Sequence, residues 1–328
     1  MNGYLCEMGL IYIKNGNICA GILTDVGGRI VSLQRDGGSN ILESNPNLWN
    51  EDETQRITPS PRLTEEEDFK AYNGHEVWVG PQSEWWKQQT LNVEKSRSAL
   101  FWPPDPYIIY DCYTVLEKTG HSIVMQGTES PISGVQLIKK IAIDENGKLH
   151  FEVTARNIRS EAVKWDLWLI TRVNGYNLNF VPVTSSEDVC LTNPSHAHQG
   201  KAPYKVENGF FSFTAEKMDS NYRECTGKAV INPAKPYMAT LAGDNLLVIR
   251  FDKQNPADIH PEQGEVELYS FATPRRETSL LELEIHAPYK TLQPGESMST
   301  RETWEVYPFP ANATEEAVRR FLEEKYKN

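Results

Sequence analysis

Hydrophobic and polar residues alternate in short runs along most of this 328-residue chain, and turn residues separate the runs. Alternation with a period of two places apolar side chains on one face of a β-strand and polar side chains on the other. Asn15-Gly16-Asn17 and Asp144-Glu145-Asn146-Gly147 each separate two such runs, which is typical of a β-hairpin. The runs predicted as strands cover 4–14, 18–24, 29–35, 107–117, 122–127, 135–143, 148–157, 162–173, 210–213, 237–241, 246–251, 264–270, 280–285 and 299–306.

One segment near the C-terminus has the helical period instead. Asn312 is predicted to cap this helix, with Glu315 three residues later as its reciprocal partner, and an apolar stripe follows through Phe321 and Leu322. Segments 44–73 and 183–205 have neither period and are predicted to be long loops. Many strands, one terminal helix and no dividing linker predict an all-β fold, a single large antiparallel β-sandwich over residues 1–328.

The charge and the apolar runs restrict the possible partners. The chain has 33 Lys and Arg residues against 45 Asp and Glu residues, a net charge of −12, which disfavours nucleic acid and anionic membrane as partners. No apolar stretch approaches the ~20 residues that span a membrane. The N-terminus lacks a signal-peptide pattern, and the five scattered cysteines fit a reducing compartment. These observations predict a cytoplasmic protein, although removal of a signal peptide would leave the same pattern.

Residues 73–86 combine aromatic and hydrogen-bonding side chains in a turn-rich segment. Trp78 and Trp86 offer rings that stack on the apolar faces of a sugar, and Gln82 offers groups for its hydroxyls. The alternative is that these tryptophans are hydrophobic plugs beneath a loop. His75 is a candidate proton shuttle, with a structural, hydrogen-bonded histidine as the alternative.

The predicted strand 162–173 has two different faces. Trp168 and Arg172 share one of them, where they are candidates to line a ligand-binding cleft. Arg172 is able to donate to sugar hydroxyls or to neutralise a carboxylate. The alternative is that this face packs in the core and that Arg172 is simply exposed to solvent.

A late strand carries carboxylates at alternating positions. Glu265, Glu267 and Tyr269 are predicted to share one face, opposite Val266 and Leu268. In a sheet that curves around a sugar, this face presents groups for general acid/base chemistry. In an ordinary surface sheet it is a solvated face.

Metal and cofactor motifs are weak or absent. His196 and His198 form a His-x-His pair, but no acid or cysteine lies at a diagnostic spacing, so no metal is predicted. The phosphate-binding, dinucleotide-binding, zinc-protease and serine-hydrolase motifs are missing. No cofactor is therefore expected.

Several short motifs, taken together, resemble the galactose mutarotase-like superfamily, and more narrowly its DUF4380 branch. The resemblance covers nearly the whole chain. The strand entry Gly27-Gly28-Arg29-Ile30 is followed by a Gly-x-Asn-x-Leu turn at 38–42, as in aldose 1-epimerases. Gly74-His75-x-x-Trp78-x-Gly80-Pro81 resembles a motif of the DUF4380 branch, and Pro294-Gly295-Glu296 resembles the mutarotase ending.

This resemblance implies a carbohydrate ligand and a role for Glu267. In aldose 1-epimerases a glutamate on a late strand is the general base, and Val266-Glu267-Leu268-Tyr269 falls in that place. Their general acid is a histidine in an Asn-His motif, but the corresponding strand, 165–172, contains no histidine. His75 is the candidate replacement.

Three functions are consistent with these residues. The leading hypothesis is a mutarotase-like enzyme that opens and recloses a mono- or oligosaccharide ring, with Glu267 as the base and His75 as the acid. The second is a carbohydrate-binding protein without catalysis. The third is a glycoside-processing enzyme that uses Glu265 and Glu267, which is disfavoured because both carboxylates approach the ligand from one side.

Overall fold

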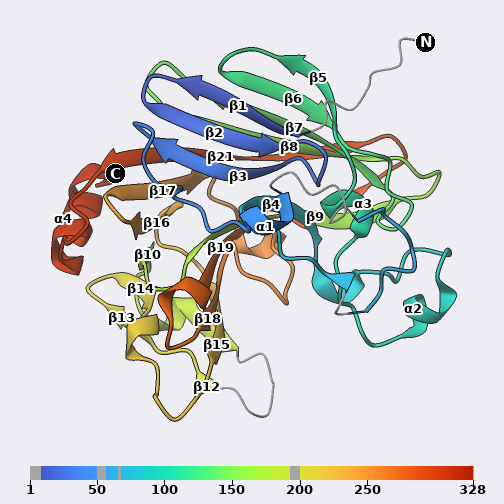
Figure 1. Cartoon of the computed structure of the whole chain (residues 1–328). Coiled ribbons are helices and arrows are strands. Elements are labelled where there is room, and N and C mark those ends of the chain that lie inside the picture. The colour runs from blue at the N-terminus through green and yellow to red at the C-terminus, as the bar shows by residue number, and fades with distance from the viewer. Residues whose placement is uncertain (1–8, 50–56, 66–67, 193–199, 328) are drawn as a thin grey trace.

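The computed structural model describes residues 9–49, 57–65, 68–192 and 200–327. This part of the chain forms two large sheets, as the alternation predicts (Figure 1). Every strand pair is antiparallel except that of β12 with β15. The all-β sandwich prediction is therefore confirmed.

The first sheet has 11 strands. Its main path contains β1 (Leu10–Asn15), β2 (Ile18–Leu23), β3 (Arg29–Arg35), β4 (His75–Gly80), β9 (Val163–Asn174), β19 (Leu280–His286), β18 (Val266–Ala272), β15 (Cys225–Ile231) and β11 (Val189–Thr192), in that order. The short strand β12 (Gly200–Lys201) pairs with β15, and β20 (Lys290–Leu292) pairs with β9.

The second sheet has ten strands. In spatial order they are β13 (Tyr204–Glu207), β14 (Phe210–Phe213), β10 (Leu178–Pro182), β16 (Tyr237–Ala242), β17 (Asn245–Phe251), β21 (Ser297–Pro308), β8 (Leu149–Asn157), β7 (Val135–Ile143), β6 (Ser122–Gln126) and β5 (Thr114–Lys118). Strands β7 and β8 alternate buried and accessible residues along their length. Their apolar faces join those of the first sheet in one hydrophobic core.

Helices are few and short in the described residues. They are α1 (Pro46–Trp49), α2 (Val93–Arg97), α3 (Pro106–Ile109) and α4 (Glu315–Lys325). None of these is long and apolar enough to cross a membrane. In α4 the buried Val318 and Leu322 pack against Phe180, Leu246 and other apolar residues of the second sheet.

Three local predictions are wrong. Thr314, not Asn312, caps α4 by accepting from the Ala317 N–H. The predicted strand 107–117 begins as α3, because Asp105 caps a turn that has Pro106 at its first position. Cys112 is disulfide-bonded, whereas Cys19, Cys190 and Cys225 are free, so the cysteines do not all fit the reducing compartment that their scattered spacing suggested.

Gly74 explains why β4 fits beside β3. Its φ is +76°, a conformation that favours glycine. A Cβ at this position would lie 2.3 Å from the carbonyl oxygen of Ile30. The Gly-His motif therefore begins with a glycine that the close strand contact requires.

Candidate functional site

Five adjacent strands of the first sheet, β4, β9, β19, β18 and β15, present polar and aromatic side chains on one face. The alternate residues of these strands, such as Val77, Leu169 and Leu283, belong to the core between the sheets. We call the opposite face the outer face. Its polar and aromatic side chains are those of Glu76, Trp78, Trp168, Arg172, Glu282, Glu284, His286, Glu267, Tyr269 and Lys228.

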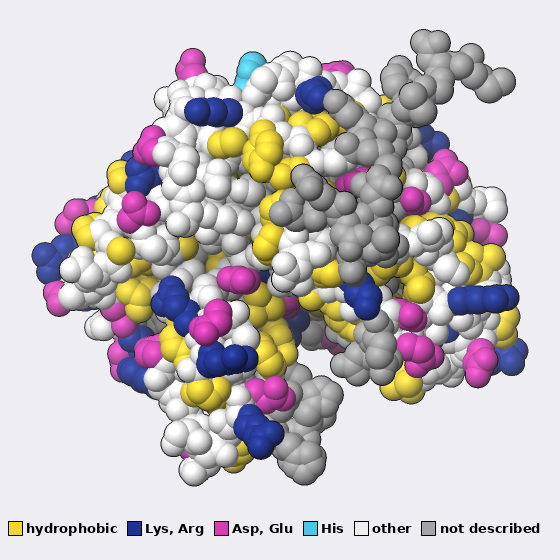
Figure 2. All heavy atoms as spheres, in the orientation of Figure 1, with side chains coloured by type: hydrophobic (Ala, Val, Ile, Leu, Met, Phe, Trp, Pro, Cys, Tyr) yellow, Lys and Arg dark blue, Asp and Glu magenta, His cyan; other side chains and the backbone are white. Residues whose placement is uncertain are grey.

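A cavity of about 740 Å³ opens on the outer face. Figure 2 shows the molecule hollowed between the part that carries β15 and β18 and the part that carries α2. Aromatic rings and charged or hydrogen-bonding groups line the cavity together. The lining residues are Thr64, Glu65, Phe69, Ala71, Asn73, Trp78, Gln82, Lys95, Leu100, Trp102, Trp168, Arg172, Lys228, Tyr269, Leu280 and Glu282.

The tryptophans predicted for a sugar site separate into two groups. Trp78 and Trp168 line the cavity, but each is only 4% exposed. Trp86 lies outside the cavity, where its indole N–H donates to the Pro103 carbonyl at 2.7 Å. Trp102, which the motifs did not indicate, also lines the cavity and is half-buried, so this residue is more exposed than Trp78 or Trp168.

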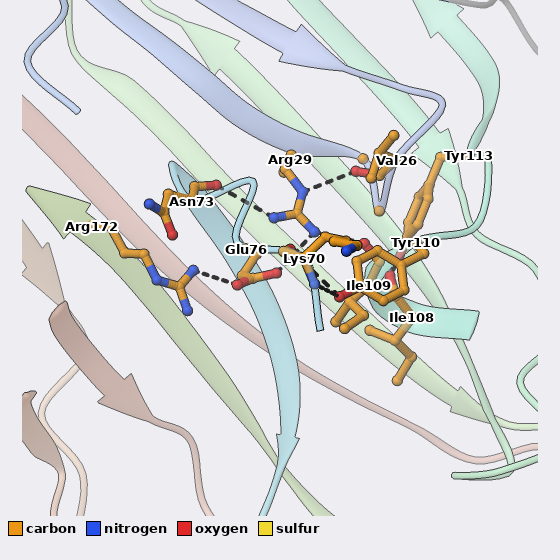
Figure 3. Close-up of polar contacts among 12 residues, drawn as sticks. Val26, Arg29, Lys70, Asn73, Glu76, Ile108, Ile109, Tyr110, Tyr113 and Arg172 are labelled. Carbon is orange, nitrogen blue, oxygen red and sulfur yellow. Dashed lines mark hydrogen bonds and ion pairs between the residues drawn. The ribbon is translucent and has the colours of Figure 1, made fainter. Parts of the chain in front are cut away.

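A chain of buried charges fixes Arg172 at the cavity wall (Figure 3). Arg172 donates through Nε to Glu282 at 2.7 Å and through Nη1 to Glu76. Arg29 Nη2 lies 3.0 Å from the other oxygen of Glu76. Burial opposes ionisation of Glu76, but the guanidinium groups of Arg29 and Arg172 hold its pKa below the ordinary value.

Glu267 contacts Lys228, which lines the cavity, and both oxygens of its carboxylate have polar partners. It is 2% exposed and does not line the cavity. Its Oε2 is 2.6 Å from Lys228 Nζ and 3.6 Å from His286 Nε2, and its Oε1 accepts from the Gly264 N–H at 2.9 Å. Burial opposes ionisation, yet Lys228 and His286 lower the pKa of Glu267 to about 2.

His286 brings an unpredicted imidazole to this carboxylate. Its Nδ1 lies 3.2 Å from Asp166 Oδ2. Burial alone disfavours the cation, but Glu267 and Asp166 together raise the pKa of His286 to about 9. A protonated histidine therefore contacts the predicted base from the neighbouring strand.

Glu284 is a second buried carboxylate beside Lys228, and it forms one cluster with Lys228, Glu267 and His286. Its Oε2 accepts from the Trp168 indole N–H at 2.7 Å and from Lys228 Nζ at 3.2 Å. Burial raises the pKa of Glu284 to about 7, against the opposing charge of Lys228. Potential metal-ligand atoms of Glu267, Glu284 and His286 lie within 4.8 Å of one another, but the Lys228 ammonium already supplies a positive charge to both carboxylates.

The structure places His75 away from the cavity. Its side chain points into the core between the sheets, where it packs against Phe151 and Trp304 and contacts Thr171 Oγ1 at 2.9 Å. Burial, with the charges of Lys139 and Arg172, holds the pKa of His75 well below its ordinary value. A neutral imidazole in this position is not the imidazolium acid that the prediction required at neutral pH, and it does not line the cavity.

Glu302 lies in the same core, where its Oε2 is 3.9 Å from His75 Nδ1. Burial raises the pKa of Glu302 to about 8, and only Trp304 donates to it among the described residues. The native state thus keeps this proton between pH 4.5 and 8 while the unfolded chain loses it, so stability falls as the pH rises.

Replacing Glu302 with Gln is expected to remove this penalty. The variant should be more stable than wild type at pH 8 by roughly 1–3 kcal/mol, the range for a poorly paired buried polar group. The two proteins should be equally stable near pH 4, where the carboxyl is protonated in both states. Urea unfolding at pH 4, 6 and 8 measures this. A variant that is less stable at pH 8 would contradict the assignment.

The remaining residues that were predicted from the sequence lie in different places. Gln82 lines the cavity. Glu265 precedes β18 and pairs with Lys253 outside the cavity, so it does not form a carboxylate pair with Glu267 there. His196 and His198 lie outside the described residues.

Sequence reasoning missed the charged residues that surround Glu267 and Arg172. The alternation of Glu282, Glu284 and His286 along one strand was a visible signal, because such spacing places all three on one face. Lys228 and Trp102 carried no comparable signal, since only the pairing of distant strands and loops brings them to the site.

Solved structures of other proteins share this fold. A galactose mutarotase-like protein from Lactobacillus casei is 12% identical, with a TM-score of 0.56 over 91% of this chain and 100% of that one. A galactose mutarotase related enzyme from Lactobacillus acidophilus is 9% identical, with a TM-score of 0.50 over 93% and 99%. These identities show similarity of fold. No curated protein matches the chain. The family described as "Domain of unknown function (DUF4380)" matches residues 10–307.

Proposed function

Because the chain belongs to the DUF4380 family and has the galactose mutarotase-like fold, we propose that it binds a carbohydrate in the outer-face cavity. The observation that carries this proposal is the composition of the cavity wall. Half-buried rings of Phe69 and Trp102 adjoin the polar groups of Gln82, Glu282 and Lys228. Sugars have apolar C–H faces and polar hydroxyl edges, and this wall offers a surface for each.

Replacing Trp102 with Ala is expected to weaken sugar binding by roughly 1–3 kcal/mol, because a large ring at a ligand site is lost. Isothermal titration with D-galactose, D-glucose, lactose and maltose measures the affinity. Trp49→Ala is the matched control, since Trp49 is also half-buried but does not line the cavity.

The outcomes separate clearly. Loss of affinity in Trp102→Ala alone, with the fold intact by circular dichroism, supports the proposal. If none of these sugars, nor a broad glycan array, binds the wild-type protein, the carbohydrate proposal fails.

Mutarotation is the second candidate. It requires a base that takes the proton of the anomeric hydroxyl and an acid that protonates the ring oxygen, after which the ring opens and recloses. The contact between Glu267 and His286 favours it, because at neutral pH the carboxylate is ionised and the imidazole protonated. The hydroxyl must reach Glu267 past Lys228, so binding without turnover is the function that the geometry supports best.

A further inference from the structure

Four cavity residues form a continuous row across four strands of the first sheet. Lys228 on β15 lies opposite Tyr269 on β18, Tyr269 lies opposite Glu282 on β19, and Glu282 lies opposite Arg172 on β9. Directly opposed residues on one face have Cβ atoms about 4.5–5.5 Å apart. All four side chains line the cavity. The strand register therefore builds one polar edge from segments far apart in the sequence.

Each group in this row has hydrogen-bonding capacity that the described residues do not use. Arg172 donates through Nε and Nη1 and Glu282 accepts through Oε1, and no hydrogen bond between described residues uses Nη2 of Arg172, Oε2 of Glu282 or the Tyr269 hydroxyl. Lys228 has three N–H donors and places them near two carboxylates, Glu267 and Glu284. The edge thus offers donors at both ends and an acceptor between them.

The charges of the row are already compensated. Arg172 lies between the carboxylates of Glu76 and Glu282, and Lys228 lies between those of Glu267 and Glu284. Within the row, neither cation is left without a carboxylate partner. The other cation that lines the cavity, Lys95, donates to the backbone carbonyls of Thr64 and Trp102. An anionic ligand at this edge would add a negative charge beside Glu282, and like charges placed together at an interface cost affinity.

We propose that the row Lys228–Tyr269–Glu282–Arg172 is the hydroxyl-binding edge of the cavity and selects a neutral sugar over a uronic acid. This inference rests on the proposed carbohydrate binding and names the ligand class. Glu282 accepts from sugar hydroxyls and excludes the carboxylate. Tyr269 and the two cations donate to sugar oxygens.

The test compares D-galactose and D-glucose with D-galacturonate and D-glucuronate by isothermal titration at pH 7. The wild-type protein should bind the neutral sugar at least about tenfold more tightly than its uronate, a difference typical of one unfavourable charge contact. Glu282→Gln should weaken binding of the neutral sugar roughly 5–30-fold, because a charged acceptor is lost. The same variant should bind the uronate more tightly, so that the preference narrows or reverses.

Two further variants keep this test decisive. Tyr269→Phe removes only a hydroxyl and should weaken neutral-sugar binding roughly 2–10-fold, even if Glu282→Gln fails to fold. Glu316→Gln removes a carboxylate that pairs with Arg320 on α4 and should change neither affinity.

The failures are distinguishable. If the wild-type protein binds uronates as well as neutral sugars, or if Glu282→Gln and Tyr269→Phe both bind like wild type, this inference is overturned while carbohydrate binding stands. If no sugar of either class binds, the proposed function fails and the inference fails with it.

Discussion

Replacing Glu76 with Gln is expected to lower the free energy of unfolding by about 3–5 kcal/mol, the range for breaking a buried ion pair by removing one partner. Glu76 is 2% exposed and is the carboxylate shared by Arg29 and Arg172. Glutamine keeps the shape and one acceptor but leaves two buried guanidinium groups facing each other. Arg172 retains Glu282, whereas Arg29 retains the backbone carbonyls of Val26, Asn73 and Ile109 and the ring of Tyr72, but no carboxylate among the described residues.

The pH dependence of this loss has a definite sign. The pKa of Glu76 is lowered in the folded state, so its contribution is complete above the ordinary value of 4.5 and is lost as the pH falls through the folded value. The deficit of Glu76→Gln should therefore be full at pH 7 and shrink in acid. Urea unfolding at pH 7 and pH 3 measures it.

The exposed ion pair of Arg301 and Asp252 provides the control. Arg301 donates to Asp252 at 2.8 Å, and both side chains are more than half exposed. Asp252→Asn should change stability far less than Glu76→Gln does, because solvent screens both charges of this pair. Equal effects of Glu76→Gln and Asp252→Asn would show that burial of the first pair does not determine its contribution.

If the protein catalyses mutarotation, the second candidate function, replacing Glu267 with Gln is expected to slow it roughly 10²–10⁴-fold, the usual contribution of a positioned acid/base group, while sugar binding is retained. Polarimetry of freshly dissolved α-D-galactose and α-D-glucose measures the rate after the spontaneous reaction is subtracted. With a base of pKa about 2 and an acid of pKa about 9, the wild-type rate should be flat between these values. It should fall above pH 9, because His286 loses its proton.

Glu265→Gln is the matched control for this experiment. Glu265 lies two residues before Glu267, is equally buried and pairs with Lys253 outside the cavity. The Glu265→Gln variant should leave the mutarotation rate unchanged. A wild-type protein that binds sugar without accelerating mutarotation would exclude the catalytic candidate, and an active Glu267→Gln would show that another group is the base.

The sequence determined most of the architecture by itself. Alternating runs such as 135–143 and 148–157 were predicted as a hairpin, and the structure has β7 and β8 there. The Gly-His motif and the mutarotase-like ending indicated the family, which the match over residues 10–307 confirms. These features are local, since period-two patterning and turn residues act within a few positions.

Only the tertiary structure decided which face of each strand holds the site. His75 and Glu76 are adjacent on β4, so they point to opposite sides, and both sides of this strand are buried. A fully buried strand has no polar face that marks the direction of a ligand. In the structure, the His75 side chain points into the core and the Glu76 side chain points toward Arg172.

The tertiary structure also decided which charges meet. Glu267 was recognisable from its strand, but the two residues that set its protonation, Lys228 and His286, come from the strands on either side. Cross-strand register brings such residues within a few ångströms whatever their separation in sequence. Local pattern therefore specifies the strands and the family, whereas pairing between distant strands specifies the cavity, its charges and the access of Glu267 to a ligand.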